Sequence, residues 1–259
     1  MALITKDFST GYLNKEVIKS INLTLENVEW LGIIGANGSG KSTFLKGISR
    51  ILKPSSGAVF FNGHNVHLAS TQGIAKEIAF LPQLQTSDLQ MSVYELVCLG
   101  RSPHKRWWEI DFNKKDLMKV DLSLNLTDMT AYKNKSVRTL SGGQRQRAYL
   151  SLALAQDAKT LLLDEPTTFL DVHYQLQFLD LLKGLNKDQN IAIITVIHDV
   201  NLAARYCDRI AVFKDGNLLA LDSPRKVLTP ELMKEAFQVE TCQIETPIGL
   251  QICTIKSCK

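Results

Sequence analysis

The chain has 259 residues, enough for one sizeable domain or for one domain with an appended lobe. Its 45% hydrophobic and 22% charged residues are typical of a globular protein, and a net charge of +4 without a polybasic tract gives no reason to expect a nucleic-acid partner. No apolar run is long enough to cross a bilayer and no apolar signal core follows the N-terminus, while five scattered cysteines indicate reduced thiols rather than a disulfide framework.

The first third of the chain predicts mostly strands. Alternating apolar and polar residues indicate strands at Leu3–Thr5 and Ile21–Leu25, with Tyr12 in the turn between them. Further strands are expected at Trp30–Ile34, at Ala58–Phe61 with a hairpin turn at Asn62-Gly63, and at Ile78–Leu81. In the turn before Glu29 we expect Asn27 to adopt a positive φ.

The middle of the chain, from about residue 88 to residue 158, predicts helices. Ser92 and Glu95 have the spacing of a capping box, which opens a helix ending near Gly100. Two further helices are expected at Asn113–Leu126 and Gly143–Ala155. We interpret this stretch as a helical insertion in an α/β core.

Strands and helices alternate in the last third, which favours a largely parallel sheet. The expected strands are Thr160–Leu163, Ile191–Ile197, a hairpin of Arg209–Lys214 and Leu218–Leu221 about Asp215-Gly216, and two short runs near Cys242–Glu245 and Leu250–Ile255. The expected helices are Asp171–Leu182, Asp199–Tyr206 and a last helix capped by Thr229-Pro230.

A glycine-rich stretch between the Trp30–Ile34 strand and a helix has the context of a phosphate-binding loop. Its residues are Gly35-Ala36-Asn37-Gly38-Ser39-Gly40-Lys41-Ser42-Thr43. Glycines allow consecutive N–H groups to point at a phosphate, and the start of the helix adds further donors and the positive end of its dipole. Lys41 supplies a cation for the outer phosphates, and the Ser42 hydroxyl is a suitable ligand for Mg²⁺.

Two acids, Asp164 and Glu165, follow the buried strand Thr160–Leu163, at the edge where α/β sheets bind ligands. Phosphoryl transfer from a nucleotide needs a carboxylate that holds Mg²⁺ and a group that orients the attacking water. Asp164 fits the first role, and Glu165 fits the second as general base.

A second candidate anion site is the helix start Leu140-Ser141-Gly142-Gly143-Gln144. A γ-phosphate could be clamped between this helix start and the phosphate loop if two copies of the chain face each other.

The order of GANGSGKST, Gln83, LSGGQ, LLLDEP, Asp171 and His198 resembles the nucleotide-binding subunits of ABC transporters. The resemblance covers nearly the whole chain. It implies a head-to-tail homodimer that sandwiches two ATP, with the phosphate loop of one copy facing Ser141–Gln144 of the other.

The resemblance also assigns individual roles. It implies that Gln83 contacts Mg²⁺ together with Ser42 and Asp164, that Asp171 lies in the loop along the dimer seam, and that His198 contacts the γ-phosphate. Tyr12 matches the aromatic residue that stacks on adenine. The implied fold is an ABC ATPase with a mostly parallel core at about 1–87 and 159–222, an antiparallel β portion, a helical subdomain at about 88–158 and a tail at about 223–259.

The segment from Leu99 to His104 and the ending Val227–Phe237 resemble the ATPases of ferric-siderophore, haem and cobalamin importers. That branch implies an ATPase (ATP and water to ADP and phosphate) at the cytoplasmic face of the inner membrane, bound to two transmembrane permease subunits and served indirectly by an extracytoplasmic binding protein. The Gly100–His104 segment would receive a coupling helix of the permease, although it could equally be a helix stop without a partner. The alternatives are an ATPase of another metal-ion importer or a non-transport ABC ATPase.

Overall fold

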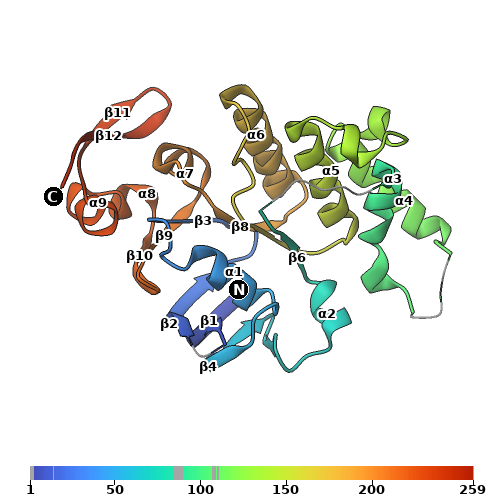
Figure 1. The fold of residues 1–259 in the computed structure, drawn as a ribbon, viewed down its shortest axis with the longest axis horizontal. Coiled ribbons are helices and arrows are strands. Elements are labelled where there is room, and N and C mark those ends of the chain that lie inside the picture. The colour runs from blue at the N-terminus through green and yellow to red at the C-terminus, as the bar shows by residue number, and fades with distance from the viewer. Residues whose placement is uncertain (1–2, 14, 84–89, 107–108, 110, 259) are drawn as a thin grey trace. The chain divides into compact units, whose positions relative to one another are not determined.

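The computed structural model describes residues 3–13, 15–83, 90–106, 109 and 111–258. The chain forms two compact units, of which the first contains Met1–Leu68, Leu163–Glu165 and Ala192–Lys259 and the second contains Ala69–Leu162 and Pro166–Ile191. The predicted helical subdomain at about 88–158 lies inside the second unit. Figure 1 shows both sheets and helices along the chain, and the prediction of an α/β fold is confirmed.

An antiparallel sheet begins the first unit. Its strands are β1 (Leu3–Tyr12), β2 (Lys15–Leu25), β4 (Pro54–Phe61) and β5 (His64–Asn65), in the order β2-β1-β4-β5. The predicted turn at Asn62-Gly63 joins β4 to β5, and both residues adopt a positive φ, of 46° and 83°. A two-residue hairpin loop with two positive φ values twists in the same sense as its strands, so this turn matches the sheet.

A second group of strands in the first unit is parallel at its centre. The central strand β3 (Trp30–Gly35) pairs in parallel with β8 (Ala192–Val196) and β9 (Arg209–Lys214), and β10 (Asn217–Asp222) adds an antiparallel edge to β9. Every residue of β3 is buried, as expected for a central parallel strand. Helices α1 (Lys41–Ile48) and α7 (Val200–Tyr206) contact this strand.

The turn that enters β3 differs from the prediction. Val28 has the positive φ, of 63°, so the prediction that Asn27 adopts it is wrong. The N–H of Glu29 donates to the carbonyl of Glu26 at 3.4 Å, which makes Val28 the third residue of a four-residue turn, a position that takes positive φ in type II turns. The Glu29 carboxylate stabilises the turn because it accepts from the Glu26 N–H at 2.7 Å.

The C-terminal part of the first unit consists of short elements. They are α8 (Pro224–Val227), which was not predicted, α9 (Pro230–Phe237), and the two-stranded hairpin β11 (Val239–Thr246) and β12 (Gly249–Ser257). Thr229 caps α9 as predicted, and its side chain accepts from the Leu232 N–H at 3.3 Å. The hairpin contacts α9 through β11 and α7 through β12.

The second unit is mainly helical. Its elements are α2 (Thr71–Ala75), β6 (Ile78–Leu81), α3 (Val93–Leu99), α4 (Lys114–Leu126), α5 (Gly142–Ala155), α6 (Val172–Asp188), the 3₁₀ turns Ser102–His104, Thr130–Tyr132 and Val137–Thr139, and β7 (Thr160–Leu163), whose last residue belongs to the first unit. The predicted capping box of Ser92 and Glu95 is present. Apolar side chains of α3, α4 and α5 form one core, which includes Val97, Val120 and Ala148.

A buried ion pair holds three helices of this unit together. Arg101, after α3, contacts the Asp116 carboxylate of α4 at 2.9 Å and donates to the Ala155 carbonyl at the end of α5 at 2.7 Å. The segment Gly100–His104 therefore stabilises the helical core, and its contact with a membrane partner stays a prediction. Within the ranges described above, none of the helices has the length and apolar character needed to span a membrane.

Candidate functional site

Glycine determines the path of the loop between β3 and α1. Gly35, Gly38 and Gly40 have φ values of 154°, 79° and 99°, which residues with a Cβ rarely adopt. At Gly35 a Cβ would lie 2.3 Å from the Phe213 carbonyl oxygen, and at Gly40 it would lie 2.6 Å from the Ile18 side chain. The loop is therefore held in one conformation by its neighbours, with the first N–H groups of α1 at its end.

Lys41 folds back over this loop. Its ammonium donates to the carbonyl oxygens of Gly35 at 2.8 Å and Ala36 at 2.9 Å, and only 5% of the residue is exposed. Burial lowers the pKa of Lys41, while the nearby carboxylates of Glu165 and Asp164 raise it. The lysine is thus positioned as a cation at the inner wall of a loop that is built to bind an anion.

Ser42 and Asp164 meet beside Lys41. The Ser42 hydroxyl donates to Asp164 Oδ1 at 2.8 Å, and Asp164 is 3% exposed. Burial raises the pKa of Asp164, whereas the hydrogen bond from Ser42 lowers it. Adjacent ligands in an octahedral Mg²⁺ site are about 2.9 Å apart, given Mg–O distances of roughly 2.0–2.1 Å. These two oxygen atoms therefore fit Mg²⁺ in type and in separation.

Glu165 and His198 form a close pair. His198 Nε2 lies 2.6 Å from Glu165 Oε1, with the side chains 45% and 15% exposed. Glu165 is the second residue after β7 and has a φ of 51°, and His198 lies between β8 and α7. The structure thus brings together two side chains that the sequence placed after separate strands.

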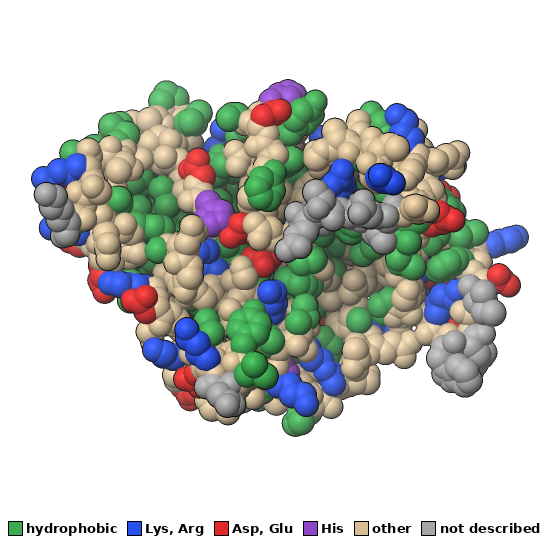
Figure 2. All heavy atoms as spheres, viewed as in Figure 1, with side chains coloured by type: hydrophobic (Ala, Val, Ile, Leu, Met, Phe, Trp, Pro, Cys, Tyr) green, Lys and Arg blue, Asp and Glu red, His purple; other side chains and the backbone are tan. Residues whose placement is uncertain are grey.

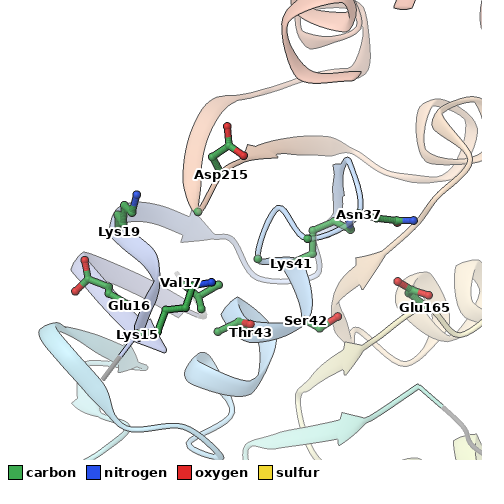
Figure 3. A pocket seen from close by; sticks show the side chains of 13 residues that line it. Lys15, Glu16, Val17, Lys19, Asn37, Lys41, Ser42, Thr43, Glu165 and Asp215 are labelled. Carbon is green, nitrogen blue, oxygen red and sulfur yellow. The ribbon is translucent and has the colours of Figure 1, made fainter. Parts of the chain in front are cut away.

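Of these groups, Lys41, Ser42 and Glu165 line a pocket of about 540 Å³ in the first unit (Figure 3). Thirteen of the described residues line it, including Asn37, Lys41, Ser42, Thr43 and Glu165, which were predicted, and Lys15, Glu16, Val17, Lys19, Asp215 and Gly216, which were not assigned to the site. Basic and acidic side chains are interspersed on the face shown in Figure 2, and the pocket lining is mixed as well, with Lys15, Lys19 and Lys41 beside Glu16, Glu165 and Asp215.

The hairpin turn Asp215-Gly216 is tied to the phosphate loop. The Gly216 N–H donates to the Ser39 carbonyl at 3.1 Å, and the Gly216 carbonyl accepts from the Lys19 N–H at 2.9 Å. A Cβ on Gly216 would lie 1.9 Å from the Val17 carbonyl oxygen. The sequence showed the turn, but its contact with the loop depends on strands that are far apart in the chain.

Tyr12 lies at the end of β1 and is 44% exposed. Its hydroxyl is 3.5 Å from Lys46 Nζ, and it is not among the thirteen described residues that line the pocket. Its stacking on adenine stays a prediction.

The LSGGQ segment begins α5 in the second unit. Ser141 and Gln144 form a capping box, in which the Ser141 hydroxyl accepts from the Gln144 N–H at 3.3 Å. Gly142 lies beside Leu170, whose side chain would be 3.8 Å from a Cβ added at the glycine. Gly143 lies beside Tyr174 in the same way, at 3.5 Å. The segment is therefore adjacent to the start of α6.

Asp171 caps α6, and its carboxylate accepts from the Tyr174 N–H at 3.1 Å. Phe169 precedes it with a φ of 70° and is 85% exposed. Gln83, an exposed residue after β6, belongs to the same unit. Its contact with Mg²⁺ stays a prediction.

The ABC transporter family profile matches residues 18–168 of the chain. The chain belongs to the ABC transporter family. It is 39% identical to the iron(3+)-hydroxamate import ATP-binding protein FhuC of Bacillus subtilis (strain 168) over 95% of this chain and 91% of that protein. The prediction of an ATP-binding, ATP-hydrolysing ABC subunit is confirmed.

Solved structures of ABC proteins share its fold. A metal-chelate type ABC transporter in an inward-facing conformation is 26% identical, with a TM-score of 0.84 over 98% of this chain and 96% of that one. An ATP-binding cassette solved as a dimer bound to ADP and Pi is 28% identical, with a TM-score of 0.72 over 86% of this chain and 99% of that one.

Proposed function

We propose that this ABC ATPase drives the import of metal chelates of the iron–siderophore, haem or cobalamin type through a membrane permease. Its similarity to the hydroxamate import protein and to the metal-chelate type transporter supports this substrate class. In this proposal the chain acts at the cytoplasmic face of the inner membrane, bound to two permease subunits, while a binding protein outside the membrane delivers the cargo.

The observation that carries the catalytic part of the proposal is the arrangement of four side chains at the phosphate loop. Ser42 and Glu165 line the same pocket as Lys41; Ser42 contacts Asp164 at 2.8 Å, and Glu165 contacts His198 at 2.6 Å. When bound, Mg²⁺ would neutralise charge on the outer phosphates, held by Ser42, Asp164 and Gln83. Lys41 and the loop N–H groups would offset the remaining phosphate charge.

Hydrolysis requires a water placed in line with the γ-phosphate. Glu165 accepts the proton of this water, a role typically worth about 10²–10⁴ in rate. His198 donates Nε2–H to the Glu165 carboxylate, which orients that carboxylate, and it contacts the γ-phosphate once ATP is bound.

A second copy of the chain would complete each site. Ser141, Gly142 and Gly143 provide a helix N-terminus whose N–H groups suit an anion, and Asp171 lies next to it in the same unit. The related cassette that was solved as a dimer supports this arrangement.

The catalytic proposal can be tested with Glu165→Gln. The variant should bind ATP and form a nucleotide-dependent dimer while its turnover falls by at least about 10²-fold, because the amide cannot accept the proton. Phosphate release, ATP binding and size-exclusion chromatography measure the three properties. Hydrolysis at the wild-type rate would contradict the role of Glu165.

The cargo can be tested in cells that lack the gene. Uptake of a radiolabelled ferric hydroxamate, haem and cobalamin is measured after complementation with the wild type or with Glu165→Gln. We expect one of the three to depend on the wild-type chain and to be lost with the variant. Unchanged uptake of all three would contradict the proposed substrate class and favour another metal-ion importer.

A further inference from the structure

The C-terminal hairpin places two cysteines directly opposite each other. In the antiparallel register of β11 and β12, Cys242 pairs with Cys253. Directly opposed residues share a face of the sheet, so both thiols lie on the same side of the hairpin. Cys253 is exposed and Cys242 is half-buried, so small reagents can reach the pair.

The opposite face of the hairpin is the one that packs on the rest of the unit. Leu250 and Ile252 are buried on β12, and the Asn201 side chain of α7 exchanges two hydrogen bonds with the Ile252 backbone, at 2.7 Å and 3.2 Å. The backbone around the cysteines is therefore held in register, while the cysteine face itself is free of this packing.

The separation of opposed residues suits a disulfide. Because the Ile252 backbone bonds Asn201 outside the hairpin, the neighbouring Cys242–Cys253 pair is a hydrogen-bonded one. The Cα atoms of such a pair lie about 5.5 Å apart, and disulfides span Cα distances of about 4.4–6.8 Å. The Cβ atoms of such a pair lie near the upper end of about 4.5–5.5 Å, against a mean of about 3.8 Å in a disulfide, so closure needs a shift of roughly 1.5 Å. A bond formed with such a shift is more reducible than a relaxed one, as reversible disulfides are.

The other cysteines are poor alternatives. Cys98 and Cys207 are buried, and burial raises the pKa of both thiols, which makes their reactive thiolate form scarce. Cys258 lies five residues beyond Cys253, about 16 Å along an extended strand, which is beyond disulfide reach. A metal site is also disfavoured, since the described part of the chain has no group of three or more His, Cys, Asp or Glu residues suited to a metal ion.

We propose that Cys242 and Cys253 form a reversible cross-strand disulfide by exchange with a low-molecular-weight disulfide such as oxidised glutathione. The Cys253 thiolate attacks one sulfur of the small disulfide, whose S–S bond breaks and releases one small thiolate. The Cys242 thiolate then attacks the Cys253 sulfur and expels the second small thiolate. Two electrons pass from the protein to the small disulfide, and the two thiol protons end on the two released thiols.

The experiment treats the full-length protein with oxidised glutathione at pH 8, alkylates the remaining thiols under denaturing conditions and analyses the peptides by mass spectrometry. The wild type should lose two of its five alkylatable thiols and yield a Cys242–Cys253 cross-linked peptide without bound glutathione. Cys258→Ser should behave like the wild type, while Cys253→Ser should lose the cross-link and retain glutathione on Cys242.

Hydrogen exchange gives a second measurement. In the oxidised protein, exchange of the backbone amides of β11 and β12 should slow by about tenfold or more, because the cross-link restricts opening of the hairpin. Stable glutathione adducts on both cysteines, a disulfide that includes Cys258, or a cross-link between two chains would each overturn the proposal. None of these outcomes depends on the ATPase activity.

Discussion

At the scale of single residues, the site contains a carboxylate whose burial opposes its ionisation. Asp164 is 3% exposed and receives one hydrogen bond, from Ser42. Burial raises its pKa in the folded protein above that of the unfolded chain. The folded state therefore binds the Asp164 proton more tightly than the unfolded chain does. The free energy of unfolding falls as the pH rises from the unfolded pKa through the folded pKa, and above the folded pKa the ionised carboxylate destabilises the protein.

Asp164→Asn should consequently stabilise the protein in the absence of nucleotide at neutral pH. We expect the melting temperature at pH 7.5 to rise by about 2–4 °C, the shift that ~1 kcal/mol produces in a chain of this length, and the gain to shrink as the pH is lowered. The further stabilisation by Mg²⁺ and ATP should be lost because a metal ligand is removed. Thermal unfolding checks both effects, with the exposed Asp121→Asn as a control. A lower melting temperature at pH 7.5 would contradict this account of Asp164.

At the scale of elements, one hairpin turn supports the phosphate loop. Gly216 has a φ of 82°, and its N–H donates to the Ser39 carbonyl. Gly63 has nearly the same φ, 83°, but no atom lies within 4 Å of a Cβ added there. The two glycines therefore share the backbone strain of an alanine substitution and differ in the close contact with Val17.

Gly216→Ala should weaken ATP binding by about tenfold or more, because the turn must move away from β2 and release the loop. Gly63→Ala carries the same strain of about 1 kcal/mol and should leave ATP affinity unchanged. Nucleotide titration measures the affinities and thermal unfolding measures the common strain. Equal ATP affinity in the two variants would show that the turn does not position the loop.

The helical unit offers a second comparison of this kind. Arg101 and Asp116 are a buried pair, whereas Lys119 and Asp157 are a pair at 2.8 Å with side chains 33% and 44% exposed. Removing one partner of a buried pair leaves an uncompensated charge, and removing one partner of an exposed pair costs little.

Arg101→Ala should therefore lower the free energy of unfolding by about 3–5 kcal/mol, and Lys119→Ala by less than about 1 kcal/mol. Urea denaturation of each variant gives the values. If both substitutions cost the same, the buried pair would not be the contact that holds α3, α4 and α5 together.

At the scale of the whole molecule, the proposed dimer depends on Ser141. Ser92→Arg provides a matched control because Ser92 and Ser141 each begin a helix of the same unit with a capping box. Each substitution should cost about 1 kcal/mol through the lost cap. Only Ser141→Arg should also introduce a bulky side chain where a second copy must approach.

We expect Ser141→Arg to abolish nucleotide-dependent dimerisation and to lower ATP turnover by about 10²-fold or more while ATP binding to the monomer is retained. Ser92→Arg should keep both dimerisation and turnover. Light scattering with Glu165→Gln as the background and phosphate release in the wild-type background are the measurements. Unchanged turnover in Ser141→Arg would refute a site shared between two copies.

The sequence by itself determined the elements and the family. The loop Gly35–Thr43, the acids after β7 and the helix start at LSGGQ are local patterns in which backbone conformation follows from residue type over a few positions. The strands and helices with clear periodicity were predicted for the same reason. The short α2 and α8 and the φ of Val28 were not, since they depend on turn hydrogen bonds rather than on periodicity.

Only the tertiary structure decided which side chains meet. Three contacts join segments that are distant in the sequence: Glu165 with His198, Ser42 with Asp164, and the Gly216 N–H with the Ser39 carbonyl of the phosphate loop. The same holds for Cys242 and Cys253, whose opposition follows from the register of one hairpin. Such contacts are fixed by sheet pairing and by packing at close range, and no local pattern in the chain encodes the distance between two side chains on different strands.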